Sequence, residues 1–92
     1  MTIARRLIIY GRVQGVGFRA FVHGHAQKLG LDGFVRNRMD GTVEALVVGE
    51  EEKIDMLIAH CHEGPPASRV SKVEASEAQG VVDKGFRHLP TV

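Results

Sequence analysis

Residues 11–19 read Gly-Arg-Val-Gln-Gly-Val-Gly-Phe-Arg, and they stand between a β-branched run and a pattern of helical spacing. We therefore expect this stretch to turn a strand into a helix. Glycine has no Cβ, so the backbone around Gly15 and Gly17 can bring several N–H groups close to one anion. Arg19 adds a planar guanidinium at the first helical turn, where the helix dipole is also positive. The stretch predicts a phosphate-binding loop.

The hydrophobic pattern on either side of this loop predicts strands and helices in a simple order. Runs rich in β-branched residues predict strands at 5–13, 34–39, 42–48, 69–75 and 85–89. Apolar residues at helical spacing predict helices at 18–29 and about 50–62. Asp40-Gly41 indicates a hairpin with a loop of two or four residues, so strand faces stay unassigned. The order is that of a split βαβ unit, an α+β fold whose antiparallel sheet carries both helices on one face.

Length and composition restrict the class of protein. Ninety-two residues suit one domain, 1–92, with one core. A net charge of +1 is far from the basic excess of proteins that follow nucleic acid backbones, and no apolar run is long enough to span a membrane. The single cysteine, Cys61, continues an apolar helical stripe and is expected to be a buried structural thiol. We expect a cytoplasmic monomer that binds neither nucleic acid nor membranes.

A second segment, Val35-Arg36-Asn37-Arg38, bears on the site. Asn37 lies near the end of a strand that can pair beside the first strand and so approach the glycine loop. The sequence contains no Cys-x5-Arg loop, no Gly-Lys-Ser/Thr, no acidic cluster for magnesium and no His-x-x-x-His pair. The predicted site therefore binds phosphate without a nucleophile, a metal ion or another cofactor.

Structural explanations compete with these functional ones. A glycine-rich turn can be only a tight connection, and Asn37 alone can be an edge-strand residue. Residues 15–20 also match Gly-x-Gly-x-x-Ala, but the following strand enters a hairpin and does not end in a ribose-binding acid. His23 and His25 face different directions on a helix, so they do not suggest a metal site.

Aromatic and basic side chains near the two segments also receive simple interpretations. Phe18, Phe21 and Phe34 are expected in the core, and Phe18 can also shape the mouth of a pocket. Arg36 and Arg38 flank Asn37 and are expected on the opposite face as solvated charges.

Two motifs connect the chain to a known family. Val13-Gln14-Gly15-Val16-Gly17-Phe18-Arg19 resembles the signature loop of the acylphosphatases, and residues 33–37 with 40–44 resemble their second motif. The resemblance continues through 64–70 and covers nearly the whole chain. It implies a ferredoxin-like βαββαβ sandwich and metal-free hydrolysis of acyl phosphates to a carboxylate and inorganic phosphate. It also implies that Asn37 positions the attacking water and that phosphate is bound by Arg19 and the loop residues Gln14, Gly15, Val16, Gly17 and Phe18.

The chemistry of acyl phosphates agrees with the missing nucleophile. The carboxylate leaving group has a conjugate acid with a pKa of roughly 4, so it departs without a general acid or a metal ion. The amide of Asn37 can orient water but cannot take up its proton. Inorganic phosphate or sulfate is the expected ligand of such a site.

Two other classes of function are compatible with parts of the sequence. The chain could be a regulatory module that holds an anion, as in the acylphosphatase-like domain of larger carbamoyl-transferring maturation proteins. It could also be an RNA-binding sheet, although Tyr10 is the only tyrosine and tryptophan is absent.

Overall fold

Five strands and two helices make up the computed structural model, which describes residues 2–79 and 82–92. In chain order they are β1 (Thr2–Arg12), α1 (Phe18–Lys28), β2 (Asp32–Asn37), β3 (Val43–Glu50), α2 (Glu51–Glu63), β4 (Arg69–Glu77) and β5 (Phe86–His88). Every predicted element is present, with boundaries that differ by a few residues. None of the helices in the described part of the chain has the length and apolar character needed to cross a membrane.

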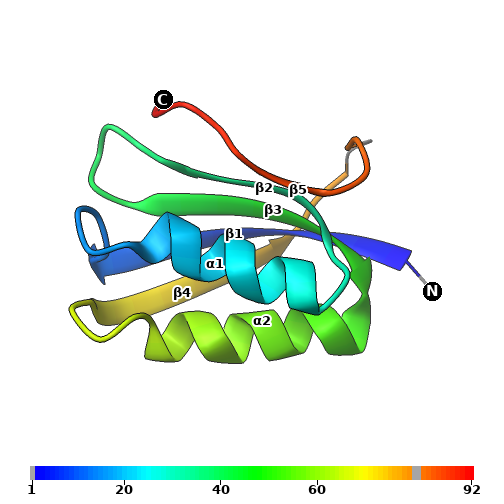
Figure 1. Ribbon diagram of the computed structural model, residues 1–92, viewed down its shortest axis with the longest axis horizontal. Helices are drawn as coiled ribbons and strands as arrows, with labels where there is room; N and C mark the ends of the chain where they lie inside the picture. Colours follow the sequence, from blue (N-terminus) through cyan, green and yellow to red (C-terminus); the bar gives the residue numbers. More distant parts are fainter. Residues whose placement is uncertain (1, 80–81) are drawn as a thin grey trace.

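The strands form one sheet in the order β4-β1-β3-β2-β5. Both helices cover the same face of this sheet (Figure 1), which confirms the predicted α+β, ferredoxin-like architecture. The pairs β1–β3, β1–β4 and β2–β3 are antiparallel, whereas β5 runs parallel to β2. The sheet is therefore mixed, which corrects the prediction of an antiparallel sheet. The difference arises because the chain passes from β4 at one edge to the far edge, where β5 runs parallel to β2.

The strand order corrects the suggestion that the second strand pairs beside the first. β2 does not pair with β1, because β3 lies between them. The α1 crossover makes β2 run parallel to β1, so a strand antiparallel to both can fill the space between them. The hairpin predicted at Asp40-Gly41 is present, and the Arg38 N–H donates to the Thr42 carbonyl 2.9 Å away to close it. The connection comprises residues 38–42, which is longer than either expected loop length.

The core lies between the sheet and the helices. Its fully buried side chains include Leu7, Ile9, Val35 and Val47 from the sheet and Val22, Ile54, Leu57 and Cys61 from the helices. Cys61 is buried as predicted, and its desolvation raises the pKa of the thiol to about 12. At neutral pH this thiol is therefore protonated and unreactive.

The opposite face of the sheet carries a network that the sequence did not indicate. Glu44 is only 3% exposed, and its carboxylate lies 2.7 Å from Arg36 Nε and 3.4 Å from Arg6 Nε. Phe34 is half-buried on this face beneath the Arg36 guanidinium, 5.0 Å from its ring centroid, so its assignment to the core was wrong. Arg36 points away from Asn37 as expected, but it is paired with a buried acid.

Candidate active site

The glycine loop owes its shape to two left-handed residues. Gly15 has φ 73° and Gly17 has φ 80°, and Gly17 is the N-cap of α1. A Cβ at either position would meet no atom within 4 Å, so glycine is required there by backbone conformation and not by lack of space. The N-terminus of α1 has no side-chain cap and no acidic side chain in its first turn. Its N–H groups and positive dipole thus remain available to an anion.

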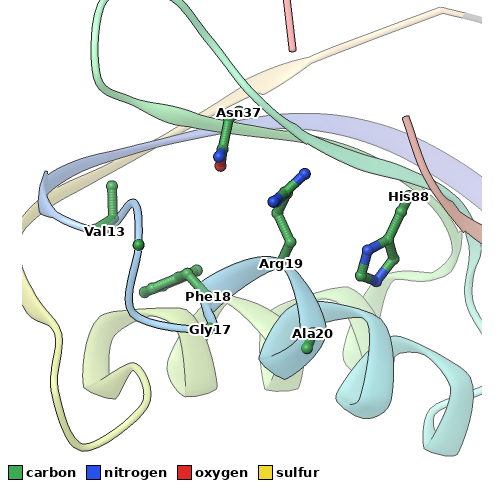
Figure 2. A pocket seen from close by; sticks show the side chains of 8 residues that line it. Val13, Gly17, Phe18, Arg19, Ala20, Asn37 and His88 are labelled. Atoms are coloured by element: carbon green, nitrogen blue, oxygen red, sulfur yellow. The ribbon is translucent and has the colours of Figure 1, made fainter. Parts of the chain in front are cut away.

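This loop forms one wall of a pocket of about 160 Å³. Figure 2 shows side chains from three parts of the chain converging there: the loop with the start of α1, the end of β2, and β5. The lining residues are Val13, Gly15, Gly17, Phe18, Arg19, Ala20, Asn37 and His88. The structure thus brings Arg19 and Asn37 together although β2 does not pair with β1.

Arg19 and Asn37 both present uncommitted polar groups to this pocket. Considering residues 2–79 and 82–92, the Arg19 guanidinium forms no hydrogen bond or ion pair, and the Asn37 side-chain amide forms no hydrogen bond. Figure 2 shows the guanidinium extending toward the side of the pocket where Asn37 lies. The backbone of Asn37 is held by the ladder to Val43 and by the Val92 N–H, which donates to its carbonyl 3.1 Å away. The site therefore combines a fixed backbone with free polar side chains.

Two residues of the predicted loop do not line the pocket. The Gln14 side-chain Nε2 donates to the carbonyls of Arg38, 2.7 Å away, and Thr42, 2.8 Å away. Gln14 therefore ties the loop to the β2–β3 hairpin, which also fixes the approach of Asn37. Val16 packs against the core and is half-buried.

His88 lines the pocket and was missed by the sequence analysis. Residues two apart on a strand share a face, so His88 lies on the same side of β5 as the buried Phe86. Its ring packs edge-on against His23 of α1, with centroids 4.8 Å apart. Burial lowers the pKa of His88, and the nearby charges of His23 and Arg19 lower it further. The pattern Phe-x-His was the available signal, but it needed the pairing of β5 beside β2 to become informative.

No group of three or more histidine, cysteine, aspartate or glutamate side chains suited to a metal ion occurs in the described ranges. The polar groups of the pocket are instead an arginine, an amide, an imidazole and backbone N–H groups. This donor-rich set suits an oxyanion.

Comparison with known proteins agrees with the geometry. The family model of the acylphosphatases matches residues 5–88. The acylphosphatase of Rhizorhabdus wittichii is 50% identical, with 98% of this chain and 91% of that protein aligned. The acylphosphatase of an Azoarcus species is 52% identical, over 98% of this chain and 93% of that one.

Solved structures agree with the sequence comparison. The crystal structure of acylphosphatase from Bacillus subtilis superimposes with a TM-score of 0.89 at 38% identity, covering 97% of this chain and 99% of that one. The fold is that of a small α+β protein, with a pocket lined by hydrogen-bond donors. The chain belongs to the acylphosphatase family. It is accordingly a hydrolase of acyl phosphates.

A second kind of structure is also similar. Full-length HypF, in a phosphate- and nucleotide-bound form, has a TM-score of 0.91 at 36% identity, covering 99% of this chain but only 12% of HypF. The same fold therefore also occurs as a small part of a much larger protein.

Proposed function

We propose that this pocket hydrolyses acyl phosphates without a metal ion. In this proposal Arg19 and the amide groups of residues 14–19 bind the phosphate, and Asn37 positions the attacking water. The observation that carries the proposal is the Arg19 guanidinium, which has no partner among the described residues and faces the same pocket as the glycine loop and Asn37.

Phosphate binding is supported by charge and by backbone geometry. A guanidinium can donate two parallel hydrogen bonds to phosphate oxygens, and such charge-assisted bonds are about twice as strong as neutral ones. The uncapped start of α1 adds N–H donors, and Gly17 lets the chain approach the anion closely. These donors act on the equatorial oxygens, where charge is spread in phosphoryl transfer.

Beyond phosphate binding, the reaction needs only a correctly positioned water molecule. The water oxygen forms a bond to phosphorus. The bond between phosphorus and the bridging oxygen of the acyl group breaks, and the carboxylate is released. The proton of the water passes to a phosphate oxygen, because the Asn37 amide has no basic site. Since the leaving carboxylate is a weak base, with a conjugate-acid pKa of about 4, its departure requires no metal ion or general acid.

The likeness to part of HypF favours a second candidate function. In this alternative, the pocket holds an anion or a partner's group without turnover. The two functions share Arg19 and the loop, so binding of phosphate alone does not separate them. Turnover does.

The test is hydrolysis of benzoyl phosphate, followed by its ultraviolet absorbance, with purified protein and a chelator present. We expect turnover that the chelator does not change, loss of binding and turnover in Arg19→Ala, and a lower kcat in Asn37→Ala. Arg69→Ala and Gln27→Ala are matched controls, because both side chains are exposed and lie outside the pocket.

Each outcome decides between the two candidates. If the wild type is inactive but inorganic phosphate still raises its melting temperature, the pocket binds anions without turnover and the alternative function is correct. Wild-type kinetics in Arg19→Ala or Asn37→Ala would contradict the assigned roles even if the wild type is active.

A further inference from the structure

One pocket side chain has no role in the proposed chemistry. His88 reaches the pocket from β5, and Figure 2 shows the Arg19 guanidinium between the glycine loop on one side and the His88 imidazole on the other. The loop amides and Arg19 account for the phosphate end. The pocket also extends to His88 and Ala20, away from the glycine loop.

The His88 ring packs against His23, which is itself tied to β5. His23 Nε2 lies 3.0 Å from the Phe86 carbonyl oxygen. A carbonyl can only accept, so His23 carries its proton on Nε2 and ties α1 to β5 at the residue two before His88. His88 itself is exposed, and the edge-on contact between the two imidazoles packs its ring against α1 at the pocket.

The environment of His88 also determines what it can donate. Arg19 and His23 of α1 are the charged and titratable side chains placed against it, and its own strand contributes the apolar Phe86. Burial and both α1 side chains disfavour the imidazolium and lower the pKa of His88. At neutral pH the ring is therefore neutral, with one N–H donor and one acceptor nitrogen.

We propose that His88 is a specificity-determining residue whose ring N–H donates a hydrogen bond to the acyl carbonyl oxygen of the substrate. This oxygen distinguishes an acyl phosphate from a phosphate ester of an alcohol or a phenol. The inference rests on the proposed function, because it assigns the acyl end of the same pocket.

The hydrogen bond strengthens as the reaction proceeds. When the bond between phosphorus and the bridging oxygen breaks, negative charge spreads over both oxygens of the carboxylate. One of these is the former carbonyl oxygen. A donor fixed beside that oxygen therefore stabilises the transition state more than the ground state, and such a donor raises kcat. The gain is larger when the departing carboxylate is more basic.

The experiment compares His88→Leu, which keeps an apolar side chain against His23 but has no donor, with His88→Gln, which keeps an N–H donor. Substituted benzoyl phosphates with carboxylic acids of different strength are the substrates, and inorganic phosphate is the inhibitor. His62→Leu is the matched control, since His62 is exposed on α2 and does not line the pocket. Circular dichroism and melting temperature confirm that each variant is folded.

We expect kcat to fall about tenfold in His88→Leu with benzoyl phosphate, the loss to grow as the leaving acid becomes weaker, and His88→Gln to recover part of it. The inhibition constant of phosphate should change less than about twofold, since the phosphate end is untouched. A structural role alone would not produce this dependence on the leaving group.

Contrary results separate the two claims. If wild type hydrolyses no acyl phosphate, the proposed function fails. If wild type is active and His88→Leu matches it, or loses the same factor with every substrate, only the role of His88 fails. If phosphate inhibition weakens in His88→Leu as much as turnover does, His88 acts on the phosphate end. That result would also overturn its proposed role.

Discussion

Two arginines on opposite faces of the sheet show how this chain separates stability from function. Arg36 lies on the face without helices, 2.7 Å from the nearly buried carboxylate of Glu44. Arg19 lies on the helix side, in a pocket, and has no hydrogen bond or ion pair with any residue that the structure describes. The first charge is neutralised within the fold. The second is available to a ligand, because no acidic side chain pairs with it among the residues that the structure describes.

Replacement of Arg19 breaks the comparison from the functional side and should have the largest effect. We expect Arg19→Met to lower kcat/KM for benzoyl phosphate by about a thousandfold, as for other arginines that stabilise phosphoryl transfer. Its urea midpoint should stay at the wild-type value, because no partner loses a contact. A clear drop in that midpoint would show that Arg19 has a structural partner after all.

Replacement of Arg36 tests the other side. Arg36→Met leaves the Glu44 carboxylate with only Arg6, 3.4 Å away, and should destabilise the protein by about 1–3 kcal/mol. Activity should remain within about twofold of wild type, since Arg36 does not line the pocket. Urea unfolding and the benzoyl phosphate assay measure the two quantities. Unchanged stability would indicate that the Arg36–Glu44 pair makes no net contribution to folding.

The glycine loop sharpens the comparison between the two arginines, because the left-handed backbone at Gly17 begins the helix that carries Arg19. Gly17→Ala places a Cβ at φ 80° and should cost about 1–2 kcal/mol of stability. Gly24→Ala, in the interior of α1 with open space around it and no positive φ, should instead add about 0.4–1 kcal/mol. Equal shifts of the two urea midpoints would mean that the left-handed conformation is not important.

The smallest expected effect concerns pH. The His25 ring of α1 stacks on His60 of α2 at a centroid distance of 3.9 Å. Burial lowers the pKa of His25, and His60 and Lys28 lower it further. The unfolded chain therefore binds this proton more readily. The stability contributed by neutral His25 is full above about pH 6.5 and declines as pH falls toward the folded-state pKa.

A direct check is urea unfolding at pH 7.5 and 5.5. His25→Gln should reduce the loss of stability between these values, whereas His62→Gln, at an exposed position on α2, should leave it unchanged. An identical pH dependence in His25→Gln and wild type would remove His25 as the cause.

The sequence predicted the local features of this fold well. Helical spacing identified both helices, and the two motifs identified Arg19, Asn37 and the glycine loop, which the structure places around one pocket. These features depend on near neighbours in the chain. The roles of Arg19 and Asn37 in turnover remain predictions.

The features that the sequence analysis missed depend on strand order and register. Without the length of the β2–β3 connection, strand faces were undetermined, so Phe34 was assigned to the core and the pairing of Arg36 with Glu44 was not foreseen. His88 reaches the site only because β5 crosses the sheet to pair with β2. Such contacts are tertiary and leave no periodic signal in a single sequence.

The interior position of β1 in the sheet also has a kinetic consequence. Among the strands that the structure describes, Thr2–Arg12 pairs with β3, which ends at Glu50, and with β4, which ends at Glu77. The first strand is therefore made before either of its partners, and its pairing is complete only after both have followed. Closing such long loops makes folding slow compared with that of a helical protein of this size. Until both partners are in place, the chain carries an unpaired apolar strand that is open to pairing with other chains.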